Sequence, residues 1–298
     1  MNWQSSLKRG ALRVMRGAGL VQLAEGSTWR RNRLAILCYH SLAVLDEHLW
    51  APALFVSAEH FEARLRWLSQ RGYQVLGLDE GLELMRRSAL PPKAVAITFD
   101  DGTADFASLA WPLLEKYRMP ATVYLTTYYV ERRKPVFGML CDYLLWRGRE
   151  LSLTAELWGS RGQRRLGSWP EREAVLGEIA AFCEKEKLSL GERESWAESL
   201  AVAVGVDYDD MLRRRMLQIM TPDEVSMVAR NGADVQLHTH RHRTPVEPTL
   251  FRQEIEENRE RIESYAGLRA KHFCYPSGKM AAEFFPWLES LGVESAVT

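Results

Sequence analysis

The sequence predicts an α/β fold in which the strands of a mostly parallel sheet alternate with helices. Two observations support this prediction. Short apolar or β-branched runs recur along the chain, and amphipathic helical patterns lie between several of them. Alternating strands and helices are typical of parallel β/α units, because a parallel pair of strands needs a long crossover connection. The 298 residues, of which 46% are hydrophobic and 26% are charged, are enough to bury a large core.

Seven strands are expected from the apolar runs. They lie at 33–39, 73–76, 93–99, 121–127, 233–239, 272–276 and 293–297. Helical spacing of apolar residues is clearest at 61–68 and at 251–265, before the second and the sixth strand. The alternation breaks between about 131 and 220, where the connection is far longer than a crossover. We expect a helical insertion there, which either forms a lid or a wall of a substrate cleft or only adds stability.

A basic arm is expected at residues 1–33, which hold seven Lys or Arg residues against one Glu. The arm either makes a weak contact with a membrane surface or packs loosely on the domain that follows, residues 34–298. No apolar run reaches the roughly 18 residues of a membrane-spanning helix. The N-terminus also lacks the apolar stretch of a signal peptide, which favours a cytoplasmic location.

Composition also limits the partners. The chain has 39 basic and 39 acidic residues and therefore a formal net charge of zero, so a nucleic-acid partner is not expected. Its four cysteines, Cys38, Cys141, Cys183 and Cys274, have no short paired spacing. This distribution fits neither a zinc ribbon nor a disulfide framework, and it predicts reduced thiols.

Two acids directly follow a buried-type strand in the segment AVAITFDDG. Adjacent side chains in a strand point to opposite faces, but Gly102 lets the chain turn, so Asp100 and Asp101 can both reach the edge of the sheet. One carboxylate is then available to hold a metal and the other to take a proton. In the alternative interpretation, Asp101 or Thr103 caps the helix that begins near Ala104, which accounts for one acid at most.

Three histidines stand at alternate positions in DVQLHTHRHRTP, directly after another apolar strand. On a helical turn, His238 and His242 share one face and can bind one cation, while His240 points elsewhere. Together with Asp101 they predict a divalent metal site that leaves open positions for water and substrate. These ligand types favour zinc and also suit other divalent ions. The alternative is a surface basic patch.

A third segment, KHFCYPSG, ends a short strand with a turn at Pro276 and Gly278. Its expected contribution is backbone, because a tight turn beside the metal can aim the Ser277 amide at a developing oxyanion. Taken alone, the segment also fits an ordinary Pro-Gly turn.

The motifs TFDDG, HTHRH and YPSG, in this order and each at a strand end, resemble the first three motifs of the polysaccharide deacetylases, carbohydrate esterase family four. The resemblance covers about residues 34–298, apart from the insertion. It implies a distorted, mostly parallel (β/α) barrel of about seven strands. It also implies metal-dependent removal of acetyl groups from N- or O-acetylated sugars. The site that it implies consists of Asp100 as catalytic base, Asp101, His238 and His242 as metal ligands, and the Ser277 amide as oxyanion donor.

The sequence departs from the family pattern in two places. Cys274 stands where the third motif often has an arginine, so another residue must orient the base. The chain reaches Thr298 as the last strand ends, before the motif that commonly supplies a histidine as general acid. Either the barrel is unclosed and the chain is a shortened copy, or another residue supplies the acid. The candidates for that residue are His40, in CYHSL, and His240.

The sequence therefore predicts a metal-dependent hydrolase that acts on an acetylated saccharide. One alternative is a shortened, inactive relative that only binds the saccharide. A second alternative is an iron oxygenase with two histidines and one carboxylate, but such enzymes usually draw ligands from a short His-x-acid pair. Both residues two positions from His240 are histidines rather than acids.

Overall fold

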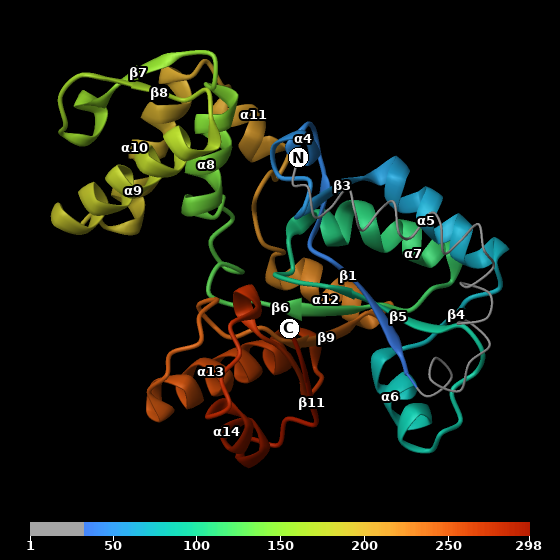
Figure 1. Ribbon diagram of the computed structural model, residues 1–298. Helices are drawn as coiled ribbons and strands as arrows, with labels where there is room; N and C mark the ends of the chain where they lie inside the picture. The colour runs from blue at the N-terminus through green and yellow to red at the C-terminus, as the bar shows by residue number, and fades with distance from the viewer. Residues whose placement is uncertain (1–32) are drawn as a thin grey trace.

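A curled sheet of seven parallel strands forms the centre of the computed structural model, which describes residues 33–298 (Figure 1). The strands are β1 (Ala35–Tyr39), β4 (Gln74–Val75), β5 (Ala94–Phe99), β6 (Thr122–Leu125), β9 (Asp234–Leu237), β10 (His272–Cys274) and β11 (Ser295–Val297). Their order is β1-β5-β6-β9-β10-β11, and β4 pairs with the first residues of β5. Each strand lies within one of the seven predicted runs. The predicted fold class, a distorted and mostly parallel (β/α) barrel, is confirmed.

Residues 1–32 lie outside the described residues. The expected basic arm therefore falls almost entirely outside the description, as does its proposed membrane contact. Within residues 33–298, no helix combines the length and the apolar character needed to cross a membrane. All four cysteines are in this part of the chain, and all are free thiols, as predicted.

Helices pack against the curled sheet and bury its core (Figure 1). They are α5 (Ala58–Gln70), α6 (Leu78–Arg86), α7 (Trp111–Tyr117), α12 (Pro222–Arg230), α13 (Pro248–Ala266) and α14 (Phe284–Ser290). The two segments with the clearest helical spacing became α5 and α13, whose predicted apolar residues Phe61, Phe251 and Ile255 are fully buried. A short π-helix, Phe106–Ala110, leads into α7.

Helix α13 illustrates how local sequence sets these boundaries. The Glu247 side chain accepts hydrogen bonds from the amides of Thr249 and Leu250, and Pro248 occupies the first turn. These features satisfy the free N–H groups at the start of the helix. At the other end, Gly267 adopts a left-handed φ of 68°, which ends the helix at little steric cost.

The long connection between β6 and β9 forms a region with its own hydrophobic core, set apart from the sheet in Figure 1. Its helices are α8 (Phe137–Arg147), α9 (Trp169–Lys185), α10 (Leu190–Ala203), α11 (Tyr208–Arg213) and a 3-10 turn, Ala155–Trp158. It also contains an antiparallel hairpin of β7 (Ser152–Thr154) and β8 (Gln163–Arg165), which the sequence pattern did not indicate. Capping boxes begin α9 at Ser168 and α10 at Ser189.

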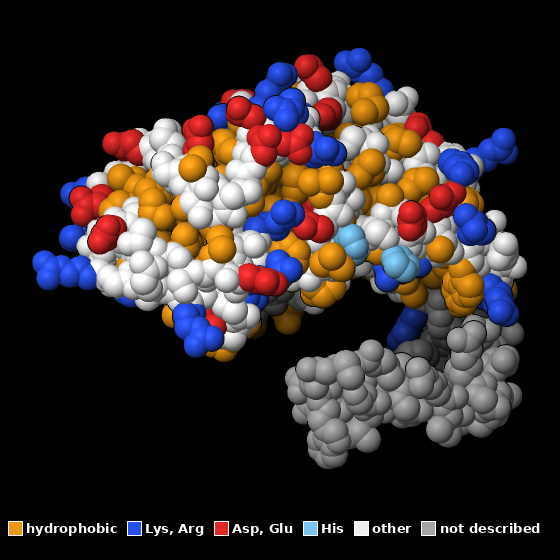
Figure 2. Space-filling model, turned by 90° about the horizontal axis from the view of Figure 1, so that it is seen from above, with side chains coloured by type: hydrophobic (Ala, Val, Ile, Leu, Met, Phe, Trp, Pro, Cys, Tyr) orange, Lys and Arg blue, Asp and Glu red, His pale blue; other side chains and the backbone are white. Residues whose placement is uncertain are grey.

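A small parallel pair, β2 (Ser41–Ala43) and β3 (Phe55–Ser57), follows β1 with the short helix α4 (Glu47–Trp50) between its strands. These strands have three residues each, too few to show a periodicity. On the face in Figure 2, basic and acidic side chains are interspersed, so this face presents no large field of one sign.

Candidate metal centre and active site

The loop after β5 turns sharply at Asp101 and Gly102, which have left-handed φ angles of 70° and 76°. Gly102 is required here, because a Cβ atom at this position would collide with the Leu125 side chain. Asp100 still belongs to the sheet, since its amide donates to the Tyr39 carbonyl at 2.9 Å. The turn lets the two adjacent carboxylates lie at the same edge of the sheet, as predicted from Gly102. Neither Asp101 nor Thr103 caps a helix, and the Thr103 hydroxyl contacts the Ser41 hydroxyl instead.

The histidine loop after β9 is not the helical turn that the spacing suggested. Thr239 and His242 both have left-handed φ angles, 61° and 54°. The backbone reversal folds the loop back, so that the rings of His238 and His242 lie 5.0 Å apart. The two side chains therefore meet as expected, but through loop strain rather than through helical periodicity.

Asp101, His238 and His242 form a compact group of possible ligands. The Asp101 Oδ1 atom lies 3.1 Å from Nε2 of His238 and 3.1 Å from Nε2 of His242. The three ligand atoms lie within 4.8 Å of one another. A tetrahedral ion with bonds of about 2.0–2.2 Å holds its ligand atoms roughly 3.3–3.6 Å apart, so small side-chain movements accommodate a divalent cation. The residues present thus fit the metal that the sequence predicted.

Asp101 and its two histidine neighbours shift one another's protonation. Burial raises the pKa of Asp101, but hydrogen bonds from His238 and His242 outweigh burial and hold that pKa well below its usual range. Burial lowers the pKa of His238, and the hydrogen bond and charge of Asp101 more than reverse this, so the net direction is upward. Asp101 is therefore ionised at neutral pH, as a metal ligand must be.

The imidazole of His238 is held in one orientation by the neighbouring strands. Its Nδ1 atom lies 2.8 Å from the Cys274 carbonyl, which accepts its hydrogen, and this leaves Nε2 directed at Asp101. Its backbone amide donates to Oδ1 of the fully buried Asn258 at 2.9 Å. The side-chain amide of Asn258 in turn donates to the Leu125 carbonyl. Asn258 thus ties the ends of β6 and β9 together beneath the site.

The group opens onto a pocket of about 710 Å³. Asp100 and His40 also line it, and the His40 Nε2 atom lies 3.8 Å from Asp100 Oδ2. The Asp100 Oδ1 atom is buried without a hydrogen-bond partner among the described residues. Ser277, with a left-handed φ of 56°, stands on the pocket wall. All five site residues predicted from the sequence therefore border one pocket: Asp100, Asp101, His238, His242 and Ser277.

The ends of the long connection form another wall of the pocket, to which Val136, Met139 and Ile219 contribute. The segment that returns from that connection, residues 218–220, forms backbone hydrogen bonds with the turn at Gly102. The Met220 amide donates to the Gly102 carbonyl at 3.0 Å, and the Ala104 amide donates to the Gln218 carbonyl at 2.8 Å. These wall residues lacked a sequence signal, because nothing in their pattern distinguishes them from ordinary apolar residues.

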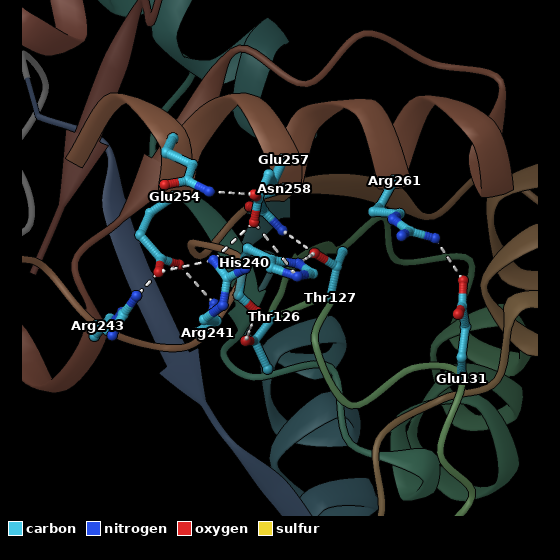
Figure 3. A network of polar contacts seen from close by, with 11 residues as sticks. Thr126, Thr127, Glu131, His240, Arg241, Arg243, Glu254, Glu257, Asn258 and Arg261 are labelled. Carbon is cyan, nitrogen blue, oxygen red and sulfur yellow. Dashed lines mark hydrogen bonds and ion pairs between the residues drawn. The ribbon is translucent and has the colours of Figure 1, made fainter. Parts of the chain in front are cut away.

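His240, the middle histidine, faces away from the metal group. Its Nδ1 atom lies 2.9 Å from the Thr127 hydroxyl and its Nε2 atom lies 3.6 Å from a Glu257 carboxylate oxygen (Figure 3). Burial and then the nearby Arg241 lower the pKa of His240. Of the two candidates for a general acid, only His40 lies on the pocket, and His240 belongs to a supporting network.

Figure 3 shows this network, in which Glu254 of α13 is the central carboxylate. Glu254 is only 1% exposed, and it contacts Arg243 Nε at 2.7 Å and Arg241 Nη1 at 3.2 Å. It also accepts the Arg241 amide at 2.7 Å. The network anchors the histidine loop on α13.

Sequence reasoning missed this network, although a signal was present. Glu254 and Asn258 lie on the same helical stripe as the apolar Phe251, Ile255 and Ile262, and all five are buried. Polar residues on the buried face of a helix need partners, so they mark internal contacts.

Comparison with known proteins places the chain in a family. The profile described as polysaccharide deacetylase matches residues 87–150 and 193–296, which together make up more than half of the chain. The protein named as polysaccharide deacetylase YxkH of Bacillus subtilis (strain 168) is 38% identical over 106 residues. The poly-beta-1,6-N-acetyl-D-glucosamine N-deacetylase of Staphylococcus aureus (strain MSSA476) is 35% identical over 75 residues. These matches cover 34% and 25% of this chain, and 36% and 26% of the two relatives.

Solved structures share the fold. The Streptococcus pyogenes deacetylase PplD in complex with acetate has a TM-score of 0.54 and 18% identity, covering 87% of this chain and 80% of that one. IcaB from Ammonifex degensii has a TM-score of 0.52 and 18% identity, covering 88% and 82%. At this level of identity the likeness concerns the fold alone. The sequence profile carries the assignment further, and the chain belongs to the polysaccharide deacetylase family.

Proposed function

We propose that this protein is a metal-dependent deacetylase of an N-acetylated saccharide. The observation that carries the proposal is the meeting of Asp101, His238 and His242 beside the partly unpartnered Asp100 in one pocket. Membership of the polysaccharide deacetylase family supports the same activity.

Zinc is the proposed metal. Two imidazole nitrogens and one carboxylate oxygen match the ligand types of catalytic zinc, and three protein ligands leave a position open for water or substrate. When bound, such an ion polarises the acetyl carbonyl and lowers the pKa of a water molecule. The proximity of these three side-chain atoms at the edge of the sheet supports this proposal.

The remaining roles are assigned by position. Asp100 takes the proton of the attacking water, because its Oδ1 atom is buried without a competing hydrogen bond. The Ser277 amide stabilises the oxyanion of the tetrahedral intermediate. His40, 3.8 Å from Asp100 and on the same pocket, returns a proton to the departing nitrogen.

The N-acetyl group of a glucosamine polymer is the proposed substrate. The names of the Staphylococcus aureus relatives state this substrate and the removal of an acetyl group from nitrogen. A pocket of about 710 Å³ is large enough for more than one sugar ring.

Acetate release is the decisive experiment. The purified chain, loaded with zinc, is incubated with oligomers of β-1,6-linked N-acetylglucosamine and, in parallel, with O-acetylated xylan. We expect acetate only from the first substrate, loss of release on chelation, and recovery on adding zinc. Release from xylan alone would contradict the proposed bond, and release that survives full removal of metal would contradict the proposed mechanism.

The alternative from the sequence, an inactive saccharide-binding protein, makes a different prediction. Such a protein would bind the N-acetylglucosamine oligomers by calorimetry and release no acetate with any divalent metal. The Asp100→Asn variant would then bind the oligomers no differently from the unmodified chain.

A further inference from the structure

We infer that Cys38, His40 and Asp100 form a second cation site, suited to zinc or another thiophilic ion, directly beside the first. The Cys38 Sγ atom lies 3.4 Å from Asp100 Oδ2, and the His40 Nε2 atom lies 3.8 Å from the same oxygen. The three ligand atoms lie within 4.8 Å of one another. This group shares no residue with the site at Asp101, His238 and His242.

The sheet register brings these side chains together. Strands β1 and β5 are parallel neighbours, with Cys38 opposite Thr98. Side chains two residues apart in a strand share a face, and His40 and Asp100 directly follow the last residues of β1 and β5, two positions after Cys38 and Thr98. The hydrogen bond from the Asp100 amide to the Tyr39 carbonyl continues the pairing to the end of the strand.

The spacing suits a tetrahedral ion. Bonds of about 2.0–2.3 Å to nitrogen, oxygen and sulfur place the ligand atoms roughly 3.3–3.8 Å apart. The 3.4 Å between Cys38 Sγ and Asp100 Oδ2 falls within this range, and the 3.8 Å between His40 Nε2 and Asp100 Oδ2 requires a small side-chain movement. Three protein ligands also leave the fourth position for water.

A second observation points to a ligand at this place. Asp100 is only 8% exposed, and its Oδ1 atom has no hydrogen-bond partner among the described residues. The contacts to Cys38 and His40 are made by the other oxygen, Oδ2, so a cation held by both carboxylate oxygens would also give the buried Oδ1 atom a partner. Cys38 and His40 also line the pocket, so an ion can reach the group from solvent.

The chemistry of the group selects soft metals. A thiol gives up its proton to solvent when it forms a bond to zinc, and the charge of the ion supports the thiolate. Thiolate and imidazole favour zinc, cobalt or cadmium over magnesium and manganese, which prefer oxygen ligands. Occupation of the site would engage Asp100 and His40. On the proposed function, excess zinc therefore inhibits the enzyme by binding its base and its acid.

Cobalt(II) titration of the full chain tests the site without substrate. We expect two ions per chain, of which the second produces a near-ultraviolet thiolate-to-cobalt charge-transfer band. Cys38→Ser should abolish the band and the second equivalent while retaining the first. The matched control Cys183→Ser, in the region of α8 to α11, should leave both unchanged. Only one bound ion, or a band that persists in Cys38→Ser, would overturn the inference.

Two further variants test the assignment of ligands. His40→Ala keeps the thiol and should weaken the second equivalent by about tenfold or more. Cys274→Ser should keep the charge-transfer band. Loss of the band in this variant would show that the thiolate ligand is Cys274 of β10 and not Cys38 of β1. Circular dichroism and a thermal melt establish that each variant is folded, so loss of the band cannot be mistaken for unfolding.

Acetate release separates this inference from the proposed function. In the unmodified chain, activity should rise to a maximum near one zinc per chain and fall with excess zinc, whereas excess manganese should not inhibit. In Cys38→Ser, excess zinc should no longer lower the activity. If no acetate is released under any condition, the proposed function fails and the cobalt titration still decides whether the second site exists.

Discussion

Two polar groups share the loop of residues 238–243, and they differ in the partners of their charged side chains. We call the group at the pocket the open group and the group around Glu254 the enclosed group. On one side, His238 and His242 meet Asp101 at a pocket, and neighbouring Asp100 keeps an oxygen without a partner. On the other side, the charges of Glu254 are enclosed by two arginines (Figure 3). The first group borders an open pocket, whereas the carboxylate of Glu254 in the second is enclosed by partners from the same loop.

The difference teaches how one sequence pattern serves two purposes. Three histidines at alternate positions look equivalent in the sequence, but His240 finds Thr127 and Glu257 inside the fold. A polar atom whose partners are already protein atoms holds structure, and one whose partners are missing is available for chemistry. Variants of the two groups test this division.

The largest effect is expected from removing two ligands of the open group. His238→Ala combined with His242→Ala leaves Asp101 alone, which is too few ligands to hold a divalent cation. Elemental analysis should find the bound metal lost and acetate release abolished. Full metal occupancy in this double variant would end the assignment of the site.

The next effect separates the two adjacent acids. Asp100→Asn should retain the first cation but lose on the order of 10²-fold or more in kcat, because the general base is missing. Metal content and kcat measured on the same preparation provide the comparison. Near-normal deacetylation would show that the unpartnered oxygen of Asp100 has no part in proton transfer.

A smaller and different effect is expected in the enclosed group. Glu254→Ala removes a buried acceptor of two partly exposed arginines and should cost about 1–3 kcal/mol of unfolding free energy, since the hydrogen bonds to this carboxylate are lost. Metal affinity should fall by about tenfold, because the histidine loop loses its anchor on α13. Glu256→Ala, on the same helix but exposed, is the control and should change neither quantity. An unchanged urea midpoint in Glu254→Ala would contradict the structural role.

The smallest expected effect is on the pH dependence of stability. It involves Asp105, a buried carboxylate that, unlike Glu254, has no arginine partner among the described contacts. Burial raises the pKa of Asp105 to about 7, although the Leu42 amide donates to it at 2.5 Å. Because the folded pKa lies above the unfolded value, the native state holds the extra proton. The contribution of protonated Asp105 to the free energy of unfolding is therefore fully present below about pH 4, and it is lost as the pH rises through 7.

Asp105→Asn removes this titration. The variant should gain at least about 1 kcal/mol relative to the unmodified chain at pH 8, and much less at pH 5, since one pKa unit corresponds to about 1.36 kcal/mol. Urea unfolding at both pH values measures the difference. A gain that is the same at pH 5 and pH 8 would mean that Asp105 does not titrate in this range.

Much of the fold and of the open group could be predicted, because both depend on local signals. Apolar runs locate strands directly, and parallel strands bring their carboxyl ends to one edge, where Asp100, His238 and Ser277 follow β5, β9 and β10. The helical geometry expected for His238 and His242 was wrong, because left-handed residues in a loop leave no periodic trace.

The enclosed group and the pocket wall could not be predicted in the same way. The contact between Glu254 and Arg241 joins a helix to a loop, and its geometry depends on how α13 packs on the sheet. Cys38 and Asp100 are 62 residues apart, and only the register of β1 against β5 places them side by side. Tertiary packing determines such contacts, whereas periodicity describes one segment at a time.

The hydrogen bonds on either side of Gly102 couple two parts of the molecule that fold around separate cores. Opening of the segment at Gln218 and Met220 must break both bonds, so amide hydrogen exchange at Ala104 and Met220 reports the same local unfolding event. A ligand that orders the loop at Asp100 and Asp101 therefore slows exchange in the returning segment as well. By thermodynamic linkage, any molecule whose affinity for the returning segment is changed by a ligand in the pocket would change the affinity for that ligand by an equal factor.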